Sequence, residues 1–553
     1  MSLLKNVGTI GSLTMVSRVA GMVREMIFAR VLGANDVTDA WFQAFIIPNV
    51  FRRLFAEGAF SAAFVPMFSK RLHNEDGKDG LEEARSFSQD VISVFVPALI
   101  ALTAIFEIAM PGVIWLLSDK PINPTEFDYS VDFARIMFPY IFLVSIVTLL
   151  TGMLNSVSRF GPGASFPIIL NLVLIGTLLG VEATHGVESS VEAMGYVVAW
   201  AIPVAGVLQL AWLVYWAHVE GFRPRWITRP KLTPEVKRLG IIALPAAIGG
   251  GAYQINTLLQ VYFLNQLEGS AISWMNYADR LNQLPLGIIG IALSTAILPT
   301  LSKFVGADDK QGAARIQSNA IELGMLLTLP ATVALAVCAV PFVTVIFGGG
   351  RFDAADAAVT GNVLAVLVMG LPAYVLVKVL VPSFYARSDT RTPVYAAIAA
   401  LVVFIAISIW NTGLVIGGTT AIFDYTVDLP LLTVESLGYG VPGIAAASAI
   451  GAWLNAAVLF AVLRIRGYYH LDLALVDRLA RQLVAAAAMG AALYFSRGLL
   501  AQVYSLNLIV QFLALGVLVA CAAIVYFGIA FITGAVSRQR VAMFMKKREP
   551  ETP

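Results

Sequence analysis

The sequence predicts an all-α polytopic membrane protein with about fourteen transmembrane helices. Of its 553 residues, 58% are hydrophobic and only 13% are charged, and the mean hydropathy is +0.79. Apolar stretches of ~20 residues, the length that crosses the hydrocarbon of a bilayer, recur along the whole chain. This combination excludes a soluble globular protein of the same length.

The expected spans cover almost the entire chain. Their approximate limits are 9–31, 38–66, 88–117, 131–157, 163–181, 192–218, 236–264, 272–301, 316–348, 355–384, 393–412, 440–465, 475–499 and 505–534. The first segment lacks a signal-peptide cleavage pattern, so we expect it to be retained. The longest non-helical insertion, 413–439, is acidic and is expected to be an external surface loop.

The charges between the spans predict the orientation of the chain. If the N-terminus is placed in the cytoplasm, most of the 37 Lys and Arg residues fall in cytoplasmic segments, and the opposite loops are acidic. The positive-inside rule therefore predicts that both termini are cytoplasmic, which requires an even number of spans.

The chain carries no recognisable enzyme or metal motif. Cys338 and Cys521 lie in apolar segments and the four histidines are scattered, so the sequence predicts neither a disulfide framework nor a metal site. We find no phosphate-binding loop and no nucleophile elbow. We expect no cofactor, no nucleic-acid partner and no enzymatic activity.

An internal repeat divides the sequence. Residues 40–70 align without gaps to residues 273–303, and the identical pairs include Trp41/Trp274, Ser61/Ser294, Ala63/Ala296, Pro66/Pro299, Ser69/Ser302 and Lys70/Lys303. A looser match links 155–167 to 383–393. Six spans separate corresponding elements, as in a parallel repeat whose axis runs along the membrane normal. We expect an N-terminal lobe (1–220), a C-terminal lobe (221–470) and an appendage of two helices with a basic tail (471–553).

Four arginines lie in the first two apolar segments: Arg18, Arg24, Arg52 and Arg53. A charged side chain at the bilayer centre costs roughly 2.5–3.5 kcal/mol on insertion scales, so these side chains require a protein-lined or water-filled cavity. An arginine fork binds phosphate oxygens in pairs and stays charged. The sequence therefore predicts an anionic substrate, with a phosphate or pyrophosphate group preferred.

The individual arginines allow more than one interpretation. Arg18 either faces the cavity or pairs with Glu25, and both Arg18 and Arg24 reach one cavity only if the helix bends at Gly21 or the cavity is wide. Arg53 either lines the cavity or pairs with Glu57 at i,i+4 spacing.

Arg52 has no acidic neighbour within a turn and shares a helix face with Asn49, so it is the better ligand of the pair. In the second repeat, Asp279 and Arg280 are adjacent and cannot face each other on a helix. We prefer Arg280 as the cavity residue, with Asp279 and Ser273 in supporting roles. Asp39 is either a gate residue or a solvated loop residue, and Lys378 either lines the cavity or extends to the membrane surface.

Long stretches of the chain resemble the MurJ (MviN) family of lipid II flippases, which belongs to the multidrug/oligosaccharidyl-lipid/polysaccharide exporter superfamily. The stretches are RVAGMVREMIFARVLGANDVTDAWFQAFIIPNVFRRLFAEGAFSAAFVPMFSK, SWMNYADRL, GIALSTAILPTLSK and FYARSDTRTPV. The resemblance implies two six-helix lobes around a central cavity, with spans 13 and 14 forming a groove for the lipid tail.

The resemblance also implies a function. Lipid II, the undecaprenyl-pyrophosphate-linked peptidoglycan precursor, would move from the inner to the outer leaflet of the bacterial cytoplasmic membrane by alternating access. Membrane lipids and the cell-wall synthesis machinery are the other implied partners. The essential arginines of the family match Arg18, Arg24, Arg52 and Arg280, and its external-gate carboxylate matches Asp39.

The chain departs from the family at two places. A glutamate found in some members is Gln283 here, and the acidic sodium-site residues of some members are not evident, with Asn256 and Asn411 as the nearest polar groups. Sodium coupling is therefore unsupported. The membrane potential is the alternative driving force, at about 2.3 kcal/mol per charge per 100 mV.

Three other functions compete with this one. A flippase for another polyprenyl-pyrophosphate-linked oligosaccharide has the same cationic requirement. A multidrug exporter of the same superfamily is disfavoured because arginines repel cationic drugs. A membrane glycosyltransferase would need catalytic carboxylates or histidines in a sizeable external loop, and no such cluster appears.

Overall fold

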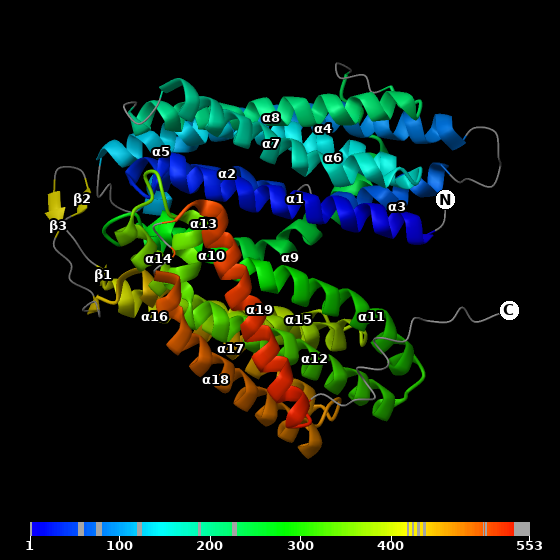
Figure 1. The fold of residues 1–553 in the computed structure, drawn as a ribbon. Coiled ribbons are helices and arrows are strands. Elements are labelled where there is room, and N and C mark those ends of the chain that lie inside the picture. The colour runs from blue at the N-terminus through cyan, green and yellow to red at the C-terminus, as the bar shows by residue number, and fades with distance from the viewer. Residues whose placement is uncertain are drawn as a thin grey trace. The chain divides into compact units, whose positions relative to one another are not determined.

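The computed structural model describes residues 3–53, 60–72, 80–118, 124–185, 190–223, 229–416, 420–422, 425–427, 432–434, 438–501, 503 and 506–535. The chain forms two compact units (Figure 1). The first contains Met1–Ser273 together with Gly349–Phe352, and the second contains Trp274–Gly348 and Asp353–Pro553.

Helices make up nearly all of both units. The first unit contains α1 (Leu3–Leu32), α2 (Asp36–Phe51), α3 (Phe60–Leu72), α4 (Gly80–Ser118), α5 (Pro124–Met137), α6 (Tyr140–Ser156), α7 (Phe160–His185), α8 (Val191–Val219) and α9 (Pro234–Leu264). Helix α10 (Ala271–Pro285) begins in the first unit and continues into the second.

The second unit then continues with a π-helical turn, Leu286–Gly290, and with α11 (Ile291–Gly306), α12 (Lys310–Val337), α13 (Ala339–Phe347) and α14 (Ala354–Leu367). A 3₁₀ turn at Val368–Gly370 leads to α15 (Leu371–Tyr385), α16 (Arg391–Thr412), α17 (Gly440–Ile465), α18 (Leu473–Ala501) and α19 (Leu508–Ile532).

This architecture confirms the predicted fold class, an all-α polytopic membrane protein. Every expected span coincides with helix in the described residues, and 11 helical segments there are long and apolar enough to cross a membrane. The other three expected spans correspond to α1, to α2 with α3, and to α9. The first two of these contain the four N-terminal arginines, which lower their apolar character.

The 413–439 insertion contains short strands that were not expected from the sequence. β1 (Leu414–Ile416) pairs antiparallel with β4 (Leu432–Val434), and β2 (Thr420–Ile422) pairs antiparallel with β3 (Tyr425–Val427). Each strand has three residues, which is too short to show the alternating pattern that predicts a strand.

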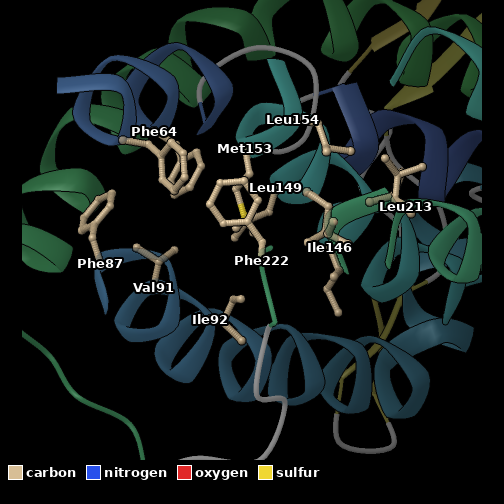
Figure 2. Close-up of a cluster of buried hydrophobic side chains, with 14 of the residues drawn as sticks. Phe64, Phe87, Val91, Ile92, Ile146, Leu149, Met153, Leu154, Leu213 and Phe222 are labelled. Carbon is tan, nitrogen blue, oxygen red and sulfur yellow. The ribbon is translucent and has the colours of Figure 1, made fainter. Parts of the chain in front are cut away.

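An aromatic and aliphatic core holds the first unit together (Figure 2). Phe64 of α3 stacks on Phe87 of α4 with ring centroids 5.7 Å apart, and α6 contributes Leu149 and Met153. Gly152 of α6 allows α3 to approach, because a Cβ there would lie 3.3 Å from the Phe64 ring. Close approach at small residues is how helices gain packing energy when lipid surrounds them.

The two repeats share a break in the same place. The α-helix gives way to a π-helical turn at Arg52–Arg53 and again at Leu286–Gly290, and the repeat alignment pairs Arg53 with Leu286. The looser repeat also has a structural counterpart, because Ser158 and Ser388 both adopt a left-handed backbone, with φ of 61° and 59°. In each turn the next amide bonds back five residues, from Arg159 to Leu154 and from Asp389 to Phe384.

Candidate functional site

Arg24 is buried in a polar cluster inside the first unit. Its side chain forms an ion pair with Glu25, and its Nη1 donates to Oδ1 of Asn171 at 3.1 Å. Arg24 is 8% exposed and Glu25 is 2% exposed. A charge buried so deeply is stable only when it is paired and hydrogen-bonded, and this cluster meets both conditions.

Asn171 ties α7 to α1 around this arginine. Its Nδ2 donates to the carbonyl of Ser17 at 3.1 Å and to that of Pro167 at 3.2 Å. A Cβ on Gly21 would lie 3.7 Å from the Asn171 side chain. Gly21 thus gives the amide room beside α1, which runs as one helix through this position. Asn171 was not among the residues predicted from the sequence, although an asparagine within a long apolar stretch is a signal for an interhelical hydrogen bond.

Arg18 lies six residues before Arg24 on α1 and is half-buried. Glu25, the alternative partner predicted for Arg18, forms an ion pair with Arg24. Within the described part of the chain, no hydrogen bond or ion pair was found for the Arg18 guanidinium. Its five N–H donors are therefore not committed to a described partner.

Arg52 and Asn49 form the expected pair on one face of α2. Arg52 Nε donates to Asn49 Oδ1 at 3.3 Å, and Asn49 Nδ2 donates to the carbonyl of Phe45 at 3.0 Å. Arg52 is half-buried, whereas Arg53 is exposed. Glu57, the predicted partner of Arg53, lies outside the described residues.

In the second unit, Asp279 and Arg280 diverge on α10 as helix geometry requires. Asp279 accepts from the side chains of Gln283 and Asn282, one turn further along the same helix. Gln283, which stands where some family members have a glutamate, therefore acts here as a donor. Arg280 is half-buried.

Asp39 caps the N-terminus of α10. Its Oδ1 accepts from the backbone N–H of Ser273 at 2.8 Å, and its Oδ2 accepts from that of Ile272 at 3.0 Å. Asp39 is 4% exposed, so it is not a solvated loop residue. A carboxylate satisfies the free N–H groups of a helix start and is favoured there by the helix dipole. Ser273 is also fully buried.

The C-terminal end of α1 is capped by the segment around Arg351, which is distant in sequence. The backbone N–H of Arg351 donates to the carbonyl of Arg30, in the last turn of α1, at 2.9 Å. Gly350 and Gly33 make the approach possible, because both have left-handed φ and a Cβ on Gly350 would lie 2.2 Å from the Arg30 oxygen. From the sequence, the run Gly348–Gly350 predicts only a tight turn, because Arg30, its partner, lies far away in the chain.

A pocket of about 210 Å³ next to Asp39 has the opposite charge to the predicted substrate site. Four carboxylates line it, those of Asp36, Asp39, Glu126 and Glu268, together with Leu264, Asn265, Leu267 and Gly269. Four carboxylates repel an anion, so this pocket does not suit the predicted substrate group. No group of His, Cys, Asp or Glu with metal-binding geometry occurs among the described residues.

Comparison with known proteins identifies the family. The profile described as "Lipid II flippase MurJ" matches residues 28–515. A "Probable lipid II flippase MurJ" of Rhizobium meliloti (strain 1021) is 39% identical over 99% of this chain and 97% of its own length. The "Lipid II flippase MurJ" of Burkholderia cenocepacia is 34% identical over 85% of both chains.

Solved structures agree on the fold. "Lipid II flippase MurJ, inward closed conformation" aligns with a TM-score of 0.72 at 20% identity, over 96% of this chain and 99% of that one. An inward-facing multidrug resistance MATE family transporter of the MOP superfamily aligns with a TM-score of 0.62 at 15% identity, over 83% of this chain and 97% of that one. Because the sequence matches extend over nearly the full length, this chain belongs to the MurJ family of lipid II flippases.

Proposed function

We propose that this chain moves lipid II from the inner to the outer leaflet of the bacterial cytoplasmic membrane by alternating access. It is a multi-pass membrane transporter of the MurJ family and not an enzyme. The observation that carries the proposal is the full-length family match, combined with a guanidinium that the fold keeps buried and charged at Arg24.

The pyrophosphate of the substrate is the group that the arginines bind. Arg24 uses two of its five N–H donors for Asn171 and Glu25, which fixes its plane and leaves the others for phosphate oxygens. Arg18 and Arg52 are the other proposed ligands in the first unit, and Arg280 is the proposed ligand in the second. Paired N–H···O bonds to phosphate are stronger and more directional than contacts of an ammonium.

The remaining residues have supporting roles in this proposal. Asn49 orients Arg52, while Asp279 and Ser273 support α10. Asp39 acts as an external gate residue, because the cap that it provides must break if the start of α10 moves away from α2. The roles of Arg53 and Glu57 as a local pair remain part of the proposal.

Orientation and lobe boundaries complete the proposal. The charge distribution supports a cytoplasmic location for both termini. The lobes are proposed to comprise residues 1–220 and 221–470, and residues 471–553 add the lipid-tail helices. The other family partners, the cell-wall synthesis enzymes, would receive the substrate on the outer side.

The MATE-like fold supports multidrug export less well than lipid II transport. The fold is shared, but the candidate ligands here are cations, and cations do not attract the cationic drugs of such exporters.

Depletion of the protein in its native cells tests the proposal. Lipid II should accumulate in the inner leaflet, and its accessibility to an external probe should fall. Arg24→Ala should fail to restore that accessibility, whereas Arg464→Ala, at the exposed end of α17, should restore it. Normal external accessibility after depletion would refute the function, and full rescue by Arg24→Ala would refute the role of the arginine.

A further inference from the structure

Lys378 is a cation inside the membrane-spanning segment Ala354–Tyr385. It lies in α15, seven residues or about 10 Å along the axis from the end of the segment at Tyr385. Its neighbours Val375, Val379 and Leu380 are buried and apolar, whereas Lys378 itself is exposed. Among the described residues, no carboxylate or hydrogen-bond acceptor pairs with it. A charged side chain at this depth marks a functional site unless it can reach the membrane surface.

The aliphatic part of the Lys378 side chain lies against the α10–α11 rod, which consists of α10, the π-helical turn and α11. A Cβ on Gly290 would lie 3.5 Å from Lys378 Cγ and 4.0 Å from its Cβ. Gly290 ends the π-helical turn Leu286–Gly290, and such turns are frequent at functional sites. The side chain is therefore directed against this turn by packing within the second unit.

The exposed surface of α11, the helix after the turn that Lys378 contacts, is more polar than a lipid-facing surface. The turn itself exposes Ile288, but the described exposed residues of α11 are small or polar and include Ala292, Thr295, Ala296, Pro299 and Thr300. On α19 the exposed residues are large and apolar, such as Ile509 at 72%, Leu513 at 64% and Ile524 at 72%. Lipid-facing helices expose the second kind of surface, so α11 borders an aqueous space.

We propose that Lys378 is a further substrate-binding residue, which contacts the diphosphate on the cytoplasmic side of Arg280. This inference rests on the proposed function. Ten residues separate Arg280 from Gly290 on the α10–α11 rod, which is about 15 Å along the axis. Lys303, in the last turn of α11, lies on the cytoplasmic side in the proposed orientation. Lys378 is thus between the cytoplasmic end of the rod and Arg280.

The residue type fits a transient contact. An ammonium is a compact and strongly hydrated point charge, whereas a guanidinium binds phosphate in a fixed, paired geometry. Lys378 attracts the diphosphate without holding it in one orientation, so the anion can pass on to Arg280.

The first test asks whether position 378 faces water. Lys378→Cys is made together with Cys521→Ser, because Cys521 is exposed and Cys338 is buried. The thiol at 378 should react with a membrane-impermeant methanethiosulfonate in inside-out vesicles, because a thiol must ionise in water to react. The same chain with Lys378 retained and Cys521→Ser is the control. No reaction at 378 in any vesicle orientation would overturn the proposal, whatever the substrate is.

The second test asks whether transport depends on the positive charge at position 378. In proteoliposomes, Lys378→Met should lower the transport of lipid II about tenfold, the usual effect of losing one contact to a charged group. Lys378→Arg should retain transport, and so should Lys303→Met. Aminoethyl modification of Lys378→Cys should restore transport, whereas sulfonatoethyl modification should not.

The outcomes separate the two proposals. If the unmodified protein moves no lipid II, the proposed function fails. If it moves lipid II and Lys378→Met does so at the same rate, Lys378 is not a substrate contact. If Lys378→Met is misfolded by its melting temperature, rescue by aminoethylation decides the question, and a lack of rescue overturns the proposal.

Discussion

At the scale of single residues, the pairing of Arg24 shows how a membrane protein keeps a charge available. Adjacent residues on a helix normally point apart, yet the long side chains of Arg24 and Glu25 meet, and Asn171 completes the cluster from α7. Glu25 lowers the cost of burial while Asn171 fixes the orientation. The guanidinium is thus paired and oriented although it is almost completely buried.

Asn171→Leu should separate these two effects. The change removes one acceptor for Arg24 and two bonds to backbone carbonyls, and it should lower the free energy of unfolding by about 1–3 kcal/mol. It should also impair rescue of depleted cells. Asn265→Leu, which loses a bond to the carbonyl of Leu117 but no arginine contact, is the control. Equal rescue by both variants would contradict the positioning role.

Asp39 is the second residue whose role can be isolated. Asp39→Ala leaves the N–H groups of Ile272 and Ser273 without their acceptors, and the loss of such a cap costs about 0.5–2 kcal/mol. Hydrogen exchange at these two amides should accelerate. Asn35→Ala, which removes the local cap of α2, should instead accelerate exchange at Val37 and Thr38. Unchanged protection at Ile272 in Asp39→Ala would disprove the cap.

At the scale of elements, the residues Arg387–Thr392 between α15 and α16 form a turn that is held by its own hydrogen bonds. Asp389 accepts from the backbone N–H of Arg391 and of Thr392, each at 3.0 Å, and it also pairs with Arg466. The hydroxyl and the amide of Thr392, with Arg466 in support, hold the pKa of Asp389 well below its usual range.

The lowered pKa of Asp389 predicts how the stability of the protein depends on pH. Because the pKa of Asp389 is lower in the folded state, its contribution is present above the unfolded pKa of about 4 and is lost as the pH falls below it. Asp389→Asn keeps an oxygen that can accept from the backbone but loses the charge that pairs with Arg466. It should therefore cost up to about 1 kcal/mol at pH 7, and progressively less below pH 4. Thermal unfolding in detergent at several pH values measures this. A difference that stays constant down to pH 3 would contradict it.

Most of the membrane-spanning helices could be predicted from the sequence, and the contacts that could not be predicted have a physical reason in common. The spans were predicted because lipid imposes a minimum apolar length. Asn171 and the turn Gly349–Phe352 were missed because their partners lie far away in sequence, 147 residues in the case of Arg24 and Asn171. The roles of Arg18, Arg52 and Arg280 stay predictions.

At the scale of the whole molecule, several arginine charges in one transport protein make the membrane potential a candidate driving force. Each charge that crosses 100 mV gains or loses about 2.3 kcal/mol, so even partial movement of Arg18, Arg24 and Arg52 relative to the field would bias the cycle. Collapsing the potential with a potassium ionophore in proteoliposomes should slow lipid II transport, and replacing sodium with choline should not. Transport that is indifferent to the potential would exclude this coupling.

The cap on α10 also bears on how the repeat arose. Asp39 and Ile272, which are hydrogen-bonded, are 233 residues apart, and 233 is also the offset that aligns the two repeats. They are therefore the same position in two copies, and a symmetric ancestor would have brought that position against itself, as in a two-fold dimer. Two aspartates there would repel each other. The bond joins the side chain of Asp39 to the backbone N–H of Ile272, so an isoleucine at the second position keeps the cap and removes the second carboxylate.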